Sequence, residues 1–353
     1  MLMDGLLSGD RFRSPVLAGV IALITVALVV LPFADDGPRA LAMGARICIF
    51  VVLVASYDVL LGYTGIVSFA HTMFFGFGAY GAAIALDNMG ASWGAIGLGT
   101  LAALGVSIVV AVAIGLLSLR VRAIFFAMIT LAAASFVLIL ASQLHEFTGG
   151  EDGITYSVPR MLKPAFKLFD GEILGLRFSG KIVSYYLVFL VSAVLFLVML
   201  RVVNSPFGRV LLAIRENEFR AEALGYRVVA YRTASFVFAA CMATLAGVLS
   251  AVWLRYTGPD TSMSFAIMID VLLMLVIGGM ASMYGAIIGV VIMNLAQFYL
   301  QDLMEVGMEA TISLPLIPEL IAPERWLLWL GVLFILCVYH FPAGIVGRLR
   351  GLK

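Results

Sequence analysis

Three side chains of the kinds that enzymes use stand near one another in the chain: Asp58, Ser68 and His71. A carboxylate, a hydroxyl and an imidazole can form a nucleophilic catalytic set. They can also be polar groups along the path of a small solute, or buried residues bonded within their own helices. Nothing in the sequence makes the three converge, and no group of residues has metal-ligand spacing. We therefore expect no enzyme and no cofactor bound by this chain.

Glycines interrupt two apolar segments, near residues 62–68 and 278–285. Backbone that leaves a helix at membrane depth must be buried in protein or line a cavity. Paired broken segments, one in each half of a chain, are typical of a transport site. The alternative is close helix packing on the glycines. The candidate residues of a solute path are Asp58, Gly62, Gly65, Ser68, His71, Gly278, Gly279 and Ser282.

Polar residues inside the apolar segments support the same interpretation. Asp58, Asp270 and Asn294 stand within runs long enough to cross a bilayer. Such residues are functional candidates by default, because placing them in hydrocarbon is unfavourable. Asp58 lies one helical turn before Gly62, so both residues share one helix face. The alternative for the two aspartates is a structural hydrogen bond to a neighbouring helix.

The segment 203–230 is strongly charged and lies between two long apolar runs. It carries four arginines, with Arg232 as a fifth just beyond it, and three glutamates. Each charge at the centre of a bilayer costs about 2.5–3.5 kcal/mol on insertion scales. The segment must therefore lie on one membrane face, where it can be offered to a soluble partner.

Composition places the chain among membrane proteins. Of its 353 residues, 63% are hydrophobic and 12% are charged, and the mean hydropathy is +1.10. Soluble domains have about 25% charged residues. A net charge of +1 gives no support for nucleic-acid binding. The three cysteines all stand inside apolar runs, which favours buried apolar side chains over disulfides or a metal site.

A bilayer span needs about 20 apolar residues. We predict an all-α polytopic membrane protein with about ten transmembrane helices, eight to ten in all, in one transmembrane domain over residues 1–353. Five segments would precede residue 182 and five would follow it, which allows an inverted repeat of two five-helix halves. The predicted segments are 15–33, 41–62, 72–87, 93–118, 123–143, 183–202, 232–254, 264–281, 283–301 and 326–342.

Orientation follows from the distribution of lysine and arginine, which favour the cytoplasmic side. Arg120 and Arg122 lie in one short connection, whereas the short connection 88–92 has no positive charge. This places the N- and C-termini and the charged segment 203–230 in the cytoplasm. The polar loop 144–181 is then extracytoplasmic.

Several motifs follow one another in a family-like order. These are LGYTGIVSFAH (61–71), TGGEDGI (148–154), GRVLLAIRENEFRAEALGY (208–226) and IGGMASMYGAIIG (277–289). Together they resemble the permease subunits of branched-chain amino-acid ABC importers, the LivM-type branch. The resemblance runs from about residue 45 to about 345. The family's usual pattern has an amide where this chain has Asp58.

The resemblance implies that residues 206–227 form a cytoplasmic coupling helix that docks into a cleft on an ATPase subunit. Phe219 and Leu224 would be apolar anchors, Arg215 and Glu222 would supply charge at the rim, and Gly225 would end the helix. The residues implied in ATPase coupling are Arg215, Glu216, Asn217, Phe219, Arg220, Glu222, Leu224 and Gly225, together with Ala221 and Ala223.

The same resemblance implies an assembly in the bacterial inner membrane. Its other members would be a second homologous permease, two cytoplasmic ATPases that bind ATP and Mg²⁺, and an extracytoplasmic solute-binding protein. We expect the loop 144–181 to form part of the docking face for that protein; the alternative is a solvated connector. The chain has no phosphate-binding loop of its own. Branched-chain or related amino acids are the expected solutes. The alternatives are the same machinery for urea, short amides or aromatic acids, and an ion-coupled secondary transporter.

Overall fold

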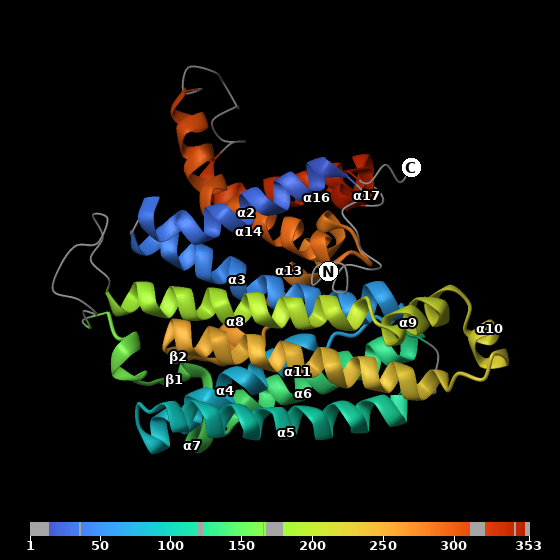
Figure 1. Ribbon diagram of the computed structural model, residues 1–353. Coiled ribbons are helices and arrows are strands. Elements are labelled where there is room, and N and C mark those ends of the chain that lie inside the picture. Colours follow the sequence, from blue (N-terminus) through green and yellow to red (C-terminus); the bar gives the residue numbers. More distant parts are fainter. Residues whose placement is uncertain are drawn as a thin grey trace, which may run out of the picture.

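The computed structural model describes residues 14–34, 37–118, 123–164, 166, 179–310, 322–341 and 344–349. Its long helices lie side by side and build one bundle (Figure 1). They are α2 (Pro15–Ala34), α3 (Pro38–Asp58), α4 (His71–Met89), α5 (Trp93–Ser118), α6 (Ala123–Gln143), α8 (Gly180–Val203), α11 (Val228–Leu254), α13 (Phe265–Gly278), α14 (Met283–Ala310) and α16 (Trp326–His340).

These helices confirm the predicted polytopic all-α fold. Nine helical segments of the described residues are long and apolar enough to cross a bilayer. The third predicted segment, 72–87, forms the buried helix α4, which is not among the nine. The reason is its composition, since α4 includes three glycines and ends in Asp87 and Asn88.

Glycines let α4 approach its neighbours at backbone distance. A Cβ added at Gly78 would lie 1.8 Å from the Thr244 carbonyl oxygen of α11, and one at Gly247 of α11 would lie 1.8 Å from the Phe75 carbonyl oxygen. Small residues at such contacts are how helices associate in lipid, where there is no hydrophobic drive between them. For this part of the chain the glycines are packing contacts.

Helix α3 occupies the centre of the bundle. From Ala40 to Asp58 every residue except Ala42 and Arg46 is buried. Four neighbouring helices, α8, α11, α13 and α14, pack around α3 and cover it. It continues into a π-helical turn, η1 (Val59–Tyr63), before the chain leaves the helix.

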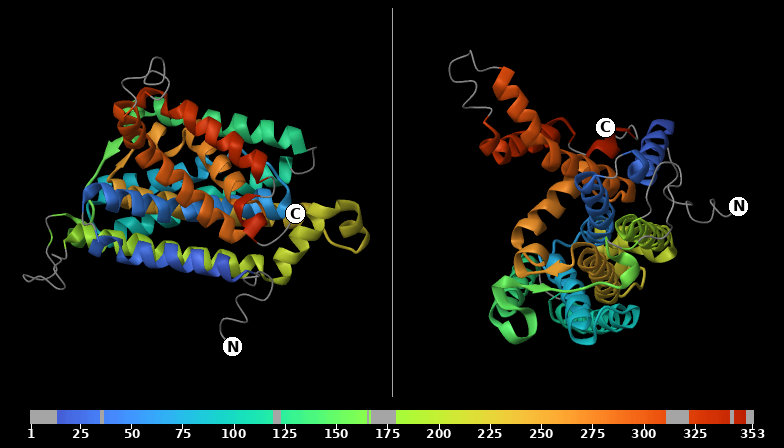
Figure 2. Two further views of the ribbon diagram at one scale, coloured as in Figure 1. Left: turned by 90° about the horizontal axis from the view of Figure 1, so that it is seen from above. Right: turned by 90° about the vertical axis from the view of Figure 1, so that its left-hand side faces the viewer.

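Short elements gather at the two ends of the bundle (Figures 1 and 2). At one end β1 (Ile154–Thr155) pairs with β2 (Tyr256–Thr257) in antiparallel register, Ile154 opposite Thr257. The other short elements of this end are α7 (His145–Thr148), η2 (Gly150–Asp152), η3 (Arg160–Leu162) and α12 (Pro259–Ser262). Beyond the opposite end of the long helices extend α9 (Pro206–Glu216) and α10 (Glu218–Ala223). Near the C-terminus, η4 (Pro323–Arg325) precedes α16 and α17 (Gly344–Leu349) follows it.

Candidate functional site

The two glycine interruptions meet in space. Asp58, at the end of α3, accepts a hydrogen bond at 2.8 Å from the backbone nitrogen of Ala281, in the connection between α13 and α14. The chain bends sharply there, with φ of 111° at Gly279 and 58° at Ala281. The Asp58 carboxylate therefore joins two segments that stand 223 positions apart in the sequence.

Gly62 makes this contact sterically feasible. A Cβ at Gly62 would lie 1.9 Å from Asp58 Oδ1 and 2.5 Å from the Ala281 nitrogen. The predicted shared face of Asp58 and Gly62 is thus present, and the space above Gly62 is filled by the carboxylate. The interruption itself begins at Gly65, whose φ is +74°, and ends where α4 starts at His71.

The second interruption is tightly packed as well. A Cβ at Gly278 would lie 1.9 Å from the Gly285 carbonyl oxygen, and one at Gly344 of α17 would lie 2.2 Å from the Gly279 Cα. Ser282 is buried beside them. The glycines on both sides serve close backbone contact in this conformation. Their part in a solute path stays a prediction.

Ser68 and His71 are buried, and neither is bonded to Asp58. The His71 Nε2 lies 2.8 Å from the Ser56 hydroxyl, and that hydroxyl donates to the Leu53 carbonyl oxygen. The histidine nitrogen is then the donor, because the serine proton is already used. Ser68 accepts from the Ala70 backbone nitrogen at 3.3 Å. The arrangement does not form a nucleophilic catalytic set.

The charged segment forms two helices and not the single helix predicted for 206–227. Asn217 is extended, with φ −157° and ψ 101°, and separates α9 from α10. Its side-chain oxygen accepts from the Arg220 backbone nitrogen at 2.9 Å and so caps α10. Because asparagine is a preferred N-cap, it was the sequence signal that could have predicted this break.

Gly225 ends α10 in a left-handed turn. Its φ is +89°, its nitrogen donates to the Glu222 carbonyl oxygen at 2.8 Å, and the Tyr226 nitrogen donates to the Ala221 carbonyl oxygen at 3.2 Å. This pair of bonds is the Schellman motif, which satisfies the last carbonyls of a helix and favours glycine at this position. The predicted role of Gly225 as the end of the helix is confirmed.

Contacts on the inner side of α10 hold it against the bundle. Glu218 accepts two hydrogen bonds from the Arg232 guanidinium of α11, at 2.8 and 3.0 Å. Ala221, expected on the partner face, is instead buried with Ile214 and Val228. The unit of α9 and α10 is therefore fixed to the start of α11.

The outer side of α10 is apolar and exposed. Phe219 is 85% exposed and Leu224 is 72% exposed, although this unit projects beyond the ends of the long helices. The charged and polar residues predicted for coupling surround them on the same projecting unit and are also exposed; they are Glu216, Asn217, Arg220 and Glu222.

Arg215 connects this unit to the first interruption. Its guanidinium donates a hydrogen bond to the Gly62 carbonyl oxygen, and its aliphatic carbons lie against Gly65, 3.1 Å from a Cβ placed there. The residue is exposed, yet its contacts are with the bundle. One arginine thus links α9 to the backbone that also carries Asp58.

An intramembrane charge was missed by the sequence reasoning. Arg46 of α3 donates to the Gln297 side-chain oxygen at 3.0 Å, and Gln297 in turn donates to Asp270 at 3.0 Å. The predicted structural role of Asp270 is thereby supported. The signal was available, because Arg46 is a lone arginine within the predicted span 41–62. Asn294 donates to the Val290 carbonyl oxygen of its own helix.

The described part of the loop 144–181 presents charge at the opposite end. Glu151 and Asp152 are exposed in the 3₁₀ turn η2, which begins at Gly150 and lies between Gly149 and Gly153; all three glycines have positive φ. The Tyr256 hydroxyl donates to the Asp152 carbonyl oxygen at 3.1 Å and ties this turn to β2. The charges at Lys167, Asp170 and Arg177 lie outside the described residues.

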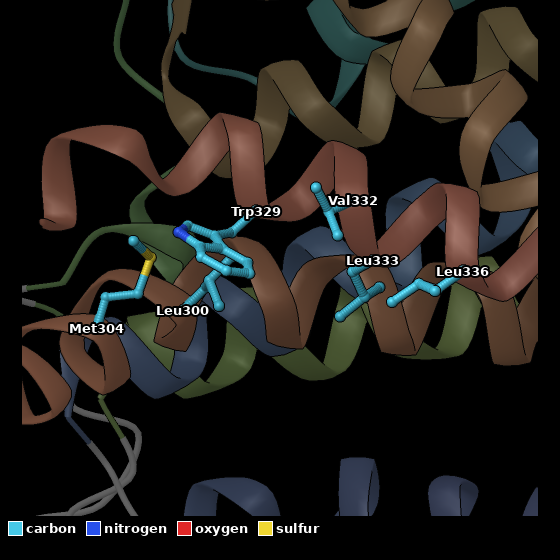
Figure 3. Close-up of a pocket in the computed structure, with 6 residues that line it drawn as sticks. All are labelled: Leu300, Met304, Trp329, Val332, Leu333 and Leu336. Carbon is cyan, nitrogen blue, oxygen red and sulfur yellow. The ribbon is translucent and has the colours of Figure 1, made fainter. Parts of the chain in front are cut away.

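A groove between α14 and α16 is apolar throughout (Figure 3). Its volume is about 400 Å³, and it is lined by Leu300, Met304, Trp329, Val332, Leu333 and Leu336. A zwitterionic solute needs partners for both of its charges. This groove offers it none.

The fold and these contacts define a polytopic helical membrane protein with an apolar surface exposed on a projecting helical unit. Residues 40–338 match the family described as the permease component of the branched-chain amino acid transport system, and the chain belongs to this family. No solved structure matches the chain.

Curated relatives carry the same description. The LivM permease protein of the high-affinity branched-chain amino acid transport system of Escherichia coli is 28% identical, over 97% of this chain and 80% of its own length. Its counterpart from Salmonella typhimurium is 27% identical over the same shares. A probable LivM permease protein of Methanocaldococcus jannaschii is 26% identical over 74% of this chain and 72% of its own length.

Proposed function

We propose that this chain is a transmembrane permease subunit of an ATP-driven ABC importer for branched-chain or related amino acids. The observation that carries the proposal is the unit of α9 and α10, which extends beyond the bundle with Phe219 and Leu224 exposed. Exposed apolar anchors surrounded by charge are typical of a protein-binding hot spot. An ion-coupled transporter needs no such docking unit.

The contacts of α9 supply a route for coupling. Arg215 bonds to the Gly62 carbonyl oxygen, and Asp58, one turn away, bonds to the Ala281 nitrogen. A displacement of α9 by an ATPase therefore acts on the contact between the two interruptions. This is a physical connection between two candidate sites, of the kind that coupling requires.

The proposal includes the rest of the assembly. Two cytoplasmic ATPases hold ATP and Mg²⁺ at their own sites, a second homologous permease completes the transmembrane part, and an extracytoplasmic solute-binding protein delivers the solute. The chain would lie in the inner membrane with both termini in the cytoplasm, which places α9 and α10 on the cytoplasmic face.

Uptake by the purified assembly tests the proposal. The complex is isolated through a tag on this chain and placed in vesicles with radiolabelled leucine and the solute-binding protein. We expect uptake only with ATP and Mg²⁺ on the side of α9 and α10. Equal uptake without ATP under a sodium or proton gradient would instead establish an ion-coupled carrier.

Charge reversal in η2 tests the role of the loop 144–181. With lysine at both Glu151 and Asp152, we expect uptake at limiting binding protein to fall several-fold, because exposed charge steers association. The defect should shrink as salt rises, since the Debye length falls to about 3 Å at 1 M salt. The control reverses Asp87, an exposed aspartate of α4 outside this loop. If the variant and the wild type show identical uptake kinetics at every salt concentration, the loop is a solvated connector.

A further inference from the structure

A cavity of about 410 Å³ lies at the end of the bundle that carries β2 and α12. Its wall is built by six helices, α3, α4, α11, α12, α13 and α14, which enclose a space in the usual range of small-molecule sites, about 300–1,000 Å³. None of its lining residues belongs to the two glycine interruptions, and two of them, Asp260 and Thr261, lie on α12, at the end of the bundle opposite to α9 and α10.

Arg46 faces this cavity. Ala42 and Arg46 are the two residues of α3 between Ala40 and Asp58 that are not buried, and both line the cavity. They stand one turn apart, so they share one helix face, and Phe50 continues that face one turn further. Arg46 is thus the charged side chain that α3 presents to the cavity.

Contacts with neighbouring side chains fix the position of the Arg46 guanidinium, but most of its N–H groups donate no hydrogen bond within the described chain. Arg46 lies over the Phe50 ring, 5.2 Å from its centroid, and gives one hydrogen bond to Gln297. A guanidinium has five donors. Among the described residues, we find no second acceptor for Arg46. Bidentate binding of a carboxylate is the geometry that arginine favours.

A negatively charged carboxylate lines the same cavity as the Arg46 guanidinium. Asp260 of α12 lines the cavity, is exposed, and has no hydrogen bond or ion pair with another described residue. The other lining residues include the aromatic side chains of Phe75, Trp253 and Phe298 and the hydroxyls of Ser250 and Thr261. The cavity therefore offers one cationic group, one anionic group and an apolar surface.

We propose that this cavity is a receiving site for an α-amino acid with an apolar side chain, which rests on the proposed function as an importer. The Arg46 guanidinium binds the solute carboxylate, the Asp260 carboxylate binds its ammonium group, and the aromatic wall holds the side chain. Its place supports this role, because β2 directly precedes α12 and is tied by the Tyr256 hydroxyl to η2, where we propose that the binding protein docks.

The site is expected to be weak. Asp260 is exposed, so its attraction for an ammonium group is screened by water. Arg46 donates a hydrogen bond to Gln297, which donates to Asp270, so the nearby Asp270 carboxylate offsets part of the positive charge of Arg46. Weak binding suits a solute that must move on, because tight binding slows release.

Photolabelling of the complete complex in lipid nanodiscs tests the proposal. The probe is photo-leucine, an α-amino acid with a diazirine in its side chain. We expect adducts in peptides that contain residues 46–50 or 253–267. Excess leucine should displace the probe, whereas isocaproate, which lacks the ammonium group, should not.

Two substitutions separate binding from structure. Asp260→Asn removes one charge from a residue with no hydrogen bond or ion pair among the described residues. We expect ~3–5-fold less labelling and a similar fall in kcat/KM for leucine uptake, because the attraction of an exposed charge is screened by water. Arg46→Gln should have the same effect but can also disturb Asp270. The matched control is Asp87→Asn, an exposed aspartate near the C-terminal end of α4, which does not line the cavity.

The outcomes distinguish the site from the function. Two outcomes would contradict the proposed site but not the importer function. In the first, the wild-type complex imports leucine while the cavity stays unlabelled. In the second, Asp260→Asn leaves the labelling unchanged. Labelling that depends on Asp260 without ATP-driven import supports the site and overturns the importer. A complex that neither imports leucine nor is labelled overturns both.

Discussion

Replacing Phe219 with serine is expected to weaken binding of the ATPase at least ~10-fold while leaving the permease folded. The ring is 85% exposed and makes no aromatic contact within the described chain. Its removal therefore takes away an anchor for a partner and little internal packing. A buried aromatic hot spot is worth about 2 kcal/mol or more at an interface, which corresponds to more than tenfold in affinity.

The measurement is a titration of detached ATPase subunits onto the permease in nanodiscs, followed by ATP hydrolysis. Met161→Ser is the matched control, since this residue is also apolar and 53% exposed but lies in η3, at the other end of the bundle. We expect it to leave ATPase affinity unchanged. Equal affinities for the two variants would show that α10 is not the docking surface.

Replacing Gly62 with alanine is expected to lower the stability of the permease by about 3 kcal/mol and to reduce uptake more than ~10-fold. The new methyl group would lie 1.9 Å from Asp58 Oδ1, so the carboxylate must move and its bond to Ala281 must break. Overpacking in a well-packed interior costs about 1–3 kcal/mol. The loss of a buried hydrogen bond to a charged group adds a similar amount.

Thermal unfolding in detergent, together with uptake in vesicles, provides the measurement. The control is Gly97→Ala in α5, where an added Cβ meets no atom within 4 Å. We expect this variant to unfold at the temperature of the wild type. If both alanine variants unfold at the same temperature, the Asp58–Ala281 contact does not hold the two interruptions together.

Helix positions were predictable from the sequence because the lipid hydrocarbon around the chain cannot form hydrogen bonds with the backbone. A chain in hydrocarbon must satisfy every backbone group internally, so a run of about 20 apolar residues becomes a helix. Segment 123–143 matches α6 and segment 93–118 matches α5 at both ends. The common face of Asp58 and Gly62 was predictable for a similar reason, because it depends only on the helical repeat.

Local rules also explain the ends of the projecting unit. Gly225 could be predicted to end the helix because a left-handed turn favours glycine. The break at Asn217 follows a local preference too, but the apolar and charged pattern of 206–227 gave equal support to one continuous helix. The extended backbone at Asn217 is stabilised where α9 and α10 pack on α11, through Ile214, Ala221 and Val228.

Tertiary structure decided which distant residues meet. Asp58 reaches Ala281, Arg215 reaches Gly62, and Arg46 reaches Gln297 across separations of 223, 153 and 251 residues. No spacing rule applies at such distances, since each contact depends on how whole helices are ordered and rotated in the bundle. The sequence by itself determined which segments are long and apolar enough to cross a membrane, apart from 72–87, and which residues are too polar to be left without a partner there. Packing around α3 determined which partner each of them has, because in lipid helices associate through shape and hydrogen bonds.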